Sequence, residues 1–154
     1  MKPHLRSATL HDAPTISQLV QSHSPLQPGM PDADGFLASI SEAAFQTRLT
    51  ESDYYFAVVE QDHALLGVIA LRQPDRIAFF FVAKGWQGQG LGRLMWDHVR
   101  EYALAHGNPG EFLVNSDVNA IAVYLRLGFV INGEQVAPNG VAFVPMQLKL
   151  AMAK

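Results

Sequence analysis

Residues 77–96 read IAFFFVAKGWQGQGLGRLMW, and the rest of the chain is interpreted outward from this stretch. Its first six residues are apolar without alternation, which predicts a central strand covered on both faces. A run that holds four of the twelve glycines follows. From Leu91 onward the apolar residues recur at helical spacing until Gly107 ends the pattern. The predicted order is therefore strand, glycine-rich turn and helix.

A glycine-rich turn at the start of a helix suits the binding of an anion. Glycine lets main-chain N–H groups approach a ligand closely, and the first N–H groups of a helix are free to donate. Arg93 adds a positive charge, so we expect phosphate groups here. Two known phosphate patterns do not fit. Leu91 stands where a P-loop requires Lys, and Arg93 stands where the dinucleotide fingerprint requires glycine. A turn without a ligand and a site for nucleotide or flavin remain alternatives.

The composition restricts the class of protein. The chain has 154 residues, of which 49% are hydrophobic and 16% charged, and it has no cysteine. This excludes disorder, disulfides and thiolate metal sites, and we expect one domain over residues 1–154. The net charge of −3 argues against a nucleic-acid surface. The chain shows neither a membrane-spanning run nor a signal segment, and its six histidines lack metal-ligand spacing. We therefore expect a cytoplasmic protein without a metal or a membrane partner.

Strands and helices are expected to alternate irregularly along the chain. Strands are predicted at 4–9, 54–60, 64–72, 77–82, 111–114, 129–136 and 141–150. Helices are predicted after Asp12 as N-cap, from Ser41, from Leu91, and after a cap at Asp117 or Asn119. Residues 23–35 are predicted to form a loop, and residues 138–140 the turn of a final hairpin.

A second stretch, VNSDVNAIAVYLRLGF at 114–129, carries Asn119 near a helix start and Tyr124 just over one turn later. Taken with residues 82–96, about 30 residues earlier, it makes the chain similar to the GNAT superfamily of acyl-CoA-dependent N-acyltransferases. The resemblance implies an α/β (mixed α+β) three-layer fold. Its central, mostly antiparallel sheet would have six to seven strands and about four flanking helices.

The resemblance also implies that acetyl-CoA is the cosubstrate. In the superfamily the glycine loop binds the pyrophosphate of the coenzyme. Carried over to this chain, the loop residues are Gln87, Gly88, Gln89, Gly90, Leu91, Gly92 and Arg93. The main chain of Phe81 and Val82 would bind the pantetheine arm, which would lie like an added strand between the diverging ends of strand 77–82 and the next strand. Asn119 would contact the coenzyme near its pantetheine.

The implied reaction is transfer of an acetyl group to a primary amine of a small molecule or peptide, by direct attack in a ternary complex. Tyr124 matches the general acid of the superfamily, and a tyrosine with its pKa near 10 stays protonated at neutral pH. Core packing by Tyr124 and simple helix capping by Asn119 are the alternatives. Overall, the resemblance favours an acyltransferase enzyme.

The general base is not evident from the sequence. Several members of the superfamily place a carboxylate on the strand before the glycine loop, but residues 77–82 have no ionisable side chain. Asp117 and Ser116, just past the next strand, remain candidates, and Asp117 also suits a helix cap. The missing carboxylate favours one alternative function, a CoA-binding or regulatory module without efficient turnover.

The acceptor pocket is expected between loop 23–37, strand 54–60 and hairpin 136–145. Its aromatic candidates, which equally suit the core, are Phe36, Tyr54, Tyr55, Phe80 and Phe143. Few charges in these segments favour a small or partly apolar amine, although Asp32, Asp34 and Asp53 would suit a cation. The apolar end strand 141–150 suggests a homodimer by strand pairing.

Overall fold

The computed structural model describes residues 2–138 and 140–151, so the predicted turn residue Asn139 lies outside the described residues. The strands are β1 (His4–Ser7), β2 (Tyr54–Gln61), β3 (Ala64–Arg72), β4 (Arg76–Val82), β5 (Glu111–Asp117), β6 (Val130–Ile131) and β7 (Phe143–Lys149). The helices are α1 (Ala13–Gln21), α2 (Ala33–Ser39), α3 (Glu42–Thr50), α4 (Leu91–Ala105) and α5 (Ile121–Leu127), and a 3-10 turn, η1 (Leu10–Asp12), precedes α1.

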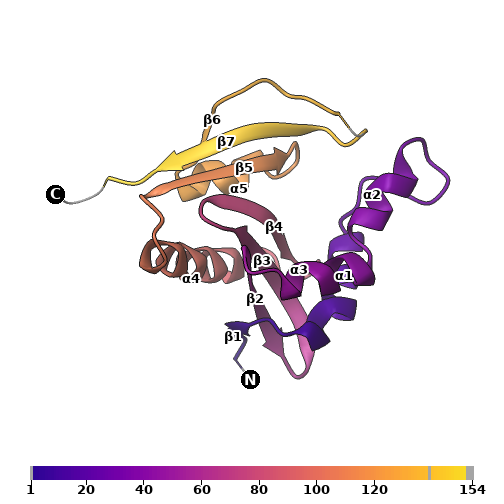
Figure 1. Ribbon diagram of the computed structural model, residues 1–154, viewed down its shortest axis with the longest axis horizontal. Coiled ribbons are helices and arrows are strands. Elements are labelled where there is room, and N and C mark those ends of the chain that lie inside the picture. The colour runs from indigo at the N-terminus through magenta and orange to yellow at the C-terminus, as the bar shows by residue number, and fades with distance from the viewer. Residues whose placement is uncertain (1, 139, 152–154) are drawn as a thin grey trace.

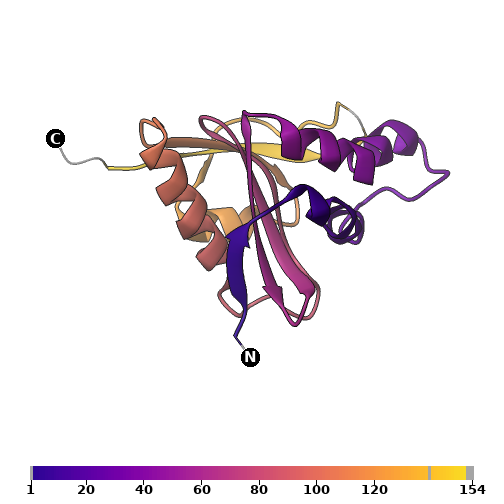
Figure 2. The ribbon, with the colours of Figure 1, turned by 60° about the horizontal axis from the view of Figure 1, so that its bottom comes forward.

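The seven strands form one sheet in the order β1-β2-β3-β4-β5-β7-β6. All neighbouring pairs are antiparallel except β4 and β5, which are parallel. The predicted mixed α/β fold with a mostly antiparallel sheet is therefore confirmed. Figure 1 shows that β5 and β7 run in a clearly different direction from β2 and β3. In Figure 2 helix α4 lies on one side of β2 and β3, and α1 and α3 lie on the other.

Each face of the sheet has its own apolar core. On one face α4 buries Met95, Trp96 and Val99, because its apolar residues follow the 3.6-residue period. The Trp96 ring meets Phe112 of β5 edge to face, with centroids 4.9 Å apart. On the other face, α1 and α3 bury Ile16 and Phe45 against the sheet. None of the helices among the described residues combines the length and apolarity that crossing a membrane requires.

Strands β2 and β3 form the most regular pair of the sheet. They are joined by a two-residue turn in which Asp62 and His63 both adopt the left-handed conformation, with φ of 52° and 67°. This backbone matches the twist of an antiparallel hairpin. The pairing runs from Tyr54 opposite Arg72 to Gln61 opposite Ala64. The middle of both strands is buried.

Strand β4 departs from the predicted central strand. Leu71 of β3 pairs with Ile77, and the preceding residue of β3, Ala70, pairs with Phe79. Ala78 is therefore an extra residue in β4. Such a bulge bends a strand. Strand β4 pairs with β5 only at Arg76 and Ile77, and the two strands separate beyond that point. Only Ile77 of β4 is buried, so the prediction of a strand covered on both faces is wrong for the rest.

Segments with weak local signals differ from the prediction. Loop 23–35 is shorter than predicted, because α2 begins at Ala33, which adds a fifth α-helix to the expected four. The predicted strand 129–136 is reduced to β6 and a single bridge at Val136. Strand β7 lies between β5 and β6, so it is not the free edge that the predicted dimer pairing assumed. The homodimer itself stays a prediction.

Asp12 occupies the predicted N-cap position of α1, but its carboxylate has a different role. Both of its oxygens accept hydrogen bonds from Arg6, each at 2.8 Å, and Oδ2 also accepts from the main-chain N–H of Thr9 at 2.7 Å. Arg6 donates in addition to Glu60 of β2, at 2.9 Å. The hydrogen bonds from Arg6 hold the pKa values of Asp12 and Glu60 below their ordinary values. This network joins β1, β2 and the start of α1.

Candidate active site

The glycine loop follows β4 directly and ends at the first residue of α4. Gly88 and Gly90 have positive φ angles of 77° and 84°, a region that other residues adopt with strain. No atom lies within 4 Å of where a Cβ would project from either glycine, so the loop faces open space. The first intrahelical bond in α4 is donated by Leu94 to Gly90, at 3.0 Å. The preceding N–H groups of the helix are therefore free for an anion.

The predicted coenzyme-binding side chains surround this loop. Gln87 donates from Nε2 to the Val82 carbonyl oxygen at 3.3 Å, and Gln89 donates to the Gly85 carbonyl oxygen at 3.5 Å. Arg93 is exposed and donates to the carbonyl oxygen of Arg126 in α5, at 3.4 Å. Leu91 is buried in the core, so only its main chain is available to the predicted site. Gly92 lies against the ring of Phe80, which is 3.6 Å from its Cβ position.

The separation of β4 from β5 opens the sheet beside the glycine loop. Beyond Ile77 no described residue of β4 pairs with β5, so one main-chain edge of Phe81 and Val82 is left without a strand partner. The other edge of both residues is paired with β3. A strand edge of this kind can bind an extended ligand by main-chain hydrogen bonds. The structure therefore brings the predicted pantetheine-binding residues to the glycine loop.

Tyr124 lies in α5 on the far side of this opening. Its ring meets Phe80 and Phe129 edge to face, with centroids 5.9 and 5.5 Å away, and the residue is 7% exposed. Burial, followed by the nearby Asp117 carboxylate, raises the pKa of the Tyr124 phenol well above its ordinary value. No described residue accepts or donates a hydrogen bond at its hydroxyl. Tyr124 is therefore both a core residue and a protonated donor at neutral pH.

The predicted residues at the end of β5 lie within that strand rather than past it. Ser116 is fully buried, and its hydroxyl donates to the Asp117 carbonyl oxygen at 2.8 Å. The Asp117 carboxylate is partly exposed and accepts from the main-chain N–H of Asn119 at 2.9 Å. The N-cap of α5 is Ala120, so the prediction that Asp117 or Asn119 caps this helix is wrong. Asn119 is exposed beside the opening.

Comparison with known proteins explains this arrangement of strand, loop and helix. The family model of the acetyltransferase (GNAT) domain matches residues 20–150. The chain belongs to the GNAT family. None of the curated proteins compared matches this chain.

Several solved structures share the GNAT fold along nearly the whole chain. A GCN5-related N-acetyltransferase from Rhodopseudomonas palustris is 23% identical, with a TM-score of 0.72 and 97% of each chain covered. PaiA N-acetyltransferase from Thermoplasma acidophilum, solved in complex with coenzyme A, is 14% identical with a TM-score of 0.77, covering 97% of this chain and 100% of that one. The ribosomal-protein-S18-alanine N-acetyltransferase from Escherichia coli is 20% identical, with a TM-score of 0.71 and coverage of 99% and 97%. At these identities the likeness establishes the fold.

The structure brings together only some of the residues that were predicted to line the acceptor pocket. A depression of about 400 Å³ is lined by Asp32, Gly35, Phe36, Ser39 and Pro138, which brings α2 to the start of the final hairpin. Tyr55 does not belong to it. Its ring stacks on Tyr102 of α4 at 3.6 Å, and its hydroxyl bonds His98 at 2.7 Å, on the α4 face of the sheet. Phe80 faces Tyr124 instead. The five predicted aromatics therefore do not form one pocket.

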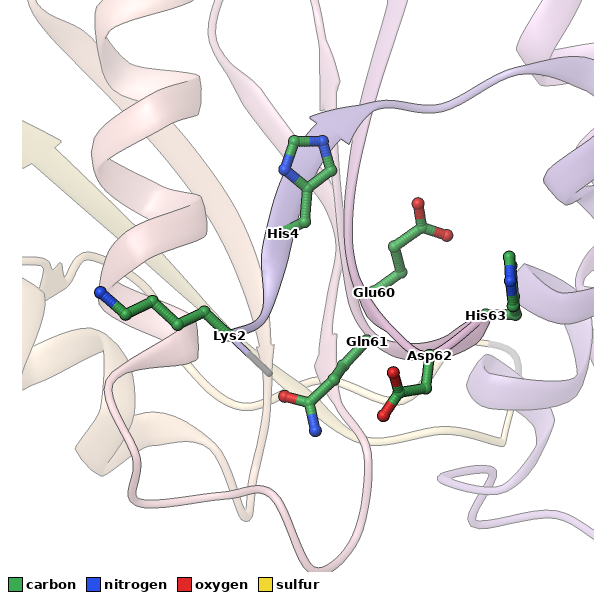
Figure 3. A pocket seen from close by; sticks show the side chains of 6 residues that line it. All are labelled: Lys2, His4, Glu60, Gln61, Asp62 and His63. Carbon is green, nitrogen blue, oxygen red and sulfur yellow. The ribbon is translucent and has the colours of Figure 1, made fainter.

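A second depression, of about 300 Å³, lies beside the turn that joins β2 and β3. It is lined by Lys2, His4, Glu60, Gln61, Asp62 and His63. Figure 3 shows that these side chains point in different directions and do not converge. Across residues 2–138 and 140–151 no three His, Cys, Asp or Glu side chains are grouped so as to hold a metal ion.

The structure adds one residue that the sequence reasoning did not select, His23. It follows α1, and its ring lies 5.2 Å from that of Phe81, between ring centroids. Its Nε2 atom is buried and has no hydrogen-bond partner among the described residues. In the sequence His23 is a single histidine at the start of a loop, without a motif around it. Its packing against β4 and its buried Nε2 atom distinguish it from the other five histidines.

Proposed function

We propose that this GNAT protein is an N-acetyltransferase that moves an acetyl group from acetyl-CoA to a primary amine in a ternary complex. One observation carries the proposal: the edge that β4 frees from β5 leads without interruption into an open glycine loop at the start of α4. Few ligands combine an extended amide chain with a pyrophosphate at one end, and coenzyme A does. The coenzyme complex of the similar PaiA acetyltransferase supports this choice.

Both the main chain and the side chains of the site would bind the coenzyme. The free edge of Phe81 and Val82 would hydrogen-bond the amides of pantetheine as an added strand. The N–H groups from Gly88 to Arg93 would bind the pyrophosphate, helped by the positive end of the α4 dipole and the Arg93 charge. The side chains of Gln87 and Gln89 would turn from the loop carbonyls to the phosphates. Asn119 would reach the coenzyme from the α5 side.

The reaction needs three proton transfers, two from the amine nitrogen and one to the leaving sulfur. A primary alkyl amine has a pKa of about 10.4 and is protonated at neutral pH, so it must lose a proton before it attacks the thioester carbon. As the new N–C bond forms and the C–S bond breaks, the nitrogen must lose a second proton and the leaving thiolate must gain one. Tyr124, whose pKa is raised by burial, remains protonated and is the proposed donor. Holding both substrates together would supply much of the remaining acceleration.

Asp117 and Ser116 remain proposed partners of the amine proton. Asp117 is the better candidate of the two, because its carboxylate is partly exposed and charged. The Ser116 hydroxyl already donates to the Asp117 carbonyl oxygen, so it would act only as a relay. The acceptor amine is proposed to enter along the depression beside Phe36, where Asp32 would attract a cation.

A second function is favoured by one observation: β4 has no ionisable side chain from Ile77 to Val82. On this alternative the protein binds coenzyme A as a regulatory module and turns over poorly. Both functions predict coenzyme binding, whereas only the first predicts amine-dependent chemistry.

The test measures binding and turnover separately. Thermal unfolding is followed with acetyl-CoA, ATP and NAD, and thiol release from acetyl-CoA is followed with a panel of primary amines. We expect stabilisation by acetyl-CoA and thiol release that depends on the amine. Stabilisation without amine-dependent release would support the regulatory module, and stabilisation by ATP or NAD alone would refute both.

A further inference from the structure

The inference concerns the protonation state and position of His23. Its Nδ1 atom lies 3.0 Å from the Leu19 carbonyl oxygen and 3.1 Å from the Ser22 hydroxyl oxygen. A carbonyl oxygen can only accept, so Nδ1 carries the proton in this contact. In the neutral ring the lone pair then lies on Nε2. Because this atom is buried without a partner among the described residues, it is an unused proton acceptor.

The position of His23 relates it to the proposed reaction centre. Its ring packs on Phe81, in the part of β4 that has left β5. The preceding residue, Phe80, packs on Tyr124. Successive side chains of a strand point to opposite faces, and Phe80 and Phe81 indeed contribute to different cores. His23 and Tyr124 therefore flank the same two residues of β4 from opposite sides of the sheet.

This arrangement matches what aminolysis of a thioester requires. The attacking amine and the leaving sulfur are different substituents of the tetrahedral intermediate at the reacting carbon, and they need opposite proton transfers. Strand β4 itself supplies no base, because its residues from Ile77 to Val82 are all apolar. Groups with different proton affinities on two sides of one site are typical of general acid–base pairs.

We propose that Nε2 of His23 takes the proton of the acceptor amine, as the base of the reaction that we propose for this protein. The acceptor ammonium first gives one proton to Nε2, which passes it to solvent. The neutral nitrogen then bonds to the thioester carbon, the C–S bond breaks, and the nitrogen gives its second proton to Nε2. The sulfur takes its proton from the Tyr124 hydroxyl. Solvent then removes the proton from His23 and returns one to Tyr124, so the overall reaction is balanced.

The test separates a base from a residue that only supports the fold. His23→Asn keeps an amide N–H close to the position of Nδ1, where it can donate to Leu19, and removes Nε2. Two acceptors of similar size are compared: benzylamine, which is protonated at neutral pH, and aniline, which is neutral. We expect amine-dependent thiol release to fall at least about 10-fold with benzylamine. With aniline it should fall no more than about 2-fold, because that amine arrives neutral, and the single proton that its nitrogen loses after attack is acidic enough to pass to water.

Two further variants serve as controls. His63→Asn makes the same change at the exposed hairpin turn and should leave both rates unchanged. Asp117→Asn tests the rival base, and a loss selective for benzylamine in this variant alone would overturn our assignment of His23. Equal losses with both amines in His23→Asn would overturn it as well, because they indicate a structural role. The acetyl-CoA thermal shift should be the same in all three variants and the wild type.

One measurement needs no turnover. Nitrogen NMR of the histidine rings in the wild-type protein should find the neutral His23 ring protonated at Nδ1, and a ring protonated at Nε2 would overturn the inference. Failure of the proposed function has a different signature. If the wild-type protein releases no thiol with any amine of the panel, the acetyltransferase proposal fails and the role of His23 as its base fails with it.

Discussion

Two neighbouring pairs of strands in this sheet behave in opposite ways. Strands β2 and β3 pair from one end to the other, and their middle residues are buried. Strands β4 and β5 pair at two positions and then separate. The apolar residues of β4 beyond Ile77 are consequently only partly buried. Similar residue types thus build a closed pair that stabilises the fold and an open pair that forms the candidate site.

The difference shows where function is separated from stability in this molecule. Changes at the closed pair should alter the free energy of unfolding and leave coenzyme binding intact. Changes at the open pair should alter binding or turnover and leave unfolding nearly unchanged. Four substitutions test this division, from the largest expected effect to the smallest.

At the open pair, Tyr124→Phe removes one hydroxyl and retains the ring that packs on Phe80 and Phe129. We expect kcat for amine acetylation to fall about 100-fold, because the leaving thiolate loses its proton donor. Acetyl-CoA affinity should stay within about 2-fold, since the hydroxyl is proposed to act in the reaction and not in binding the coenzyme. Steady-state kinetics and calorimetric titration measure the two quantities. An unchanged kcat would remove Tyr124 from the mechanism.

At the closed part of the sheet, Asp12→Ala should lower the free energy of unfolding by about 2 kcal/mol, because Arg6 loses a charged partner. The effect should depend on pH. Arg6 lowers the pKa of Asp12 in the folded protein, so this stabilisation is present above the ordinary carboxyl pKa of about 3.9 and is lost as the pH falls through the lowered value. Urea unfolding at pH 7 and at pH 3 measures the difference.

The difference between wild type and Asp12→Ala should therefore shrink in acid. A difference that is the same at both pH values would contradict the ionic role of this network. Acetyl-CoA affinity at pH 7 should be the same in both proteins, because Asp12 lies at the start of α1 and not in the glycine loop.

Gly90→Ala places a side chain at φ of 84° in the loop where phosphate is proposed to bind. We expect acetyl-CoA affinity to fall about 10-fold, because the strain shifts the N–H groups of the loop. Gly85→Ala is the matched control, since Gly85 has φ of 89°, is also exposed, and lies before the loop residues proposed to bind the pyrophosphate. Equal losses of affinity in the two variants would contradict a specific role for Gly90.

The smallest effect is expected at the β2–β3 turn. His63→Gly should raise the free energy of unfolding by about 0.5 kcal/mol. Glycine adopts the left-handed conformation without strain, and this gain exceeds the cost of its greater entropy in the unfolded chain. Ala64→Gly, one residue later inside β3, should lower it instead. Thermal unfolding of both variants measures the effect. A stabilised Ala64→Gly would show that the turn conformation is not the cause.

The parts of the molecule that were predictable from sequence carry local signals. The bounds of α4 follow from its apolar spacing and from Gly107, and the β2–β3 hairpin follows from two apolar runs around a short turn. The glycine loop and Tyr124 were found because their spacing matches a family pattern. These features depend on a few neighbouring residues.

The parts that were missed depend on contacts between distant residues. Even the separation of β4 from β5 was expected only from the family resemblance, because the run from Ile77 to Val82 reads the same whether or not β5 stays beside it. Helix α2 is a short helix with an internal glycine, and it packs beside Pro138 to line a depression. His23 is ordinary in sequence and becomes distinctive only because α1 brings it against Phe81.

The extra residue in β4 has a consequence for how this protein can change over generations. Ala78 and Phe79 both belong to the core formed with α1 and α3, so removing Ala78 would leave the later residues of β4 on their present faces and in their present register with β3. The strand would lose the bend that a bulge produces. A single-residue deletion there would therefore straighten β4 beside the candidate site, whereas a substitution would change one side chain and keep the bend. New acceptors should be reached by exchanging side chains of residues 79–82, with the length of the strand held fixed.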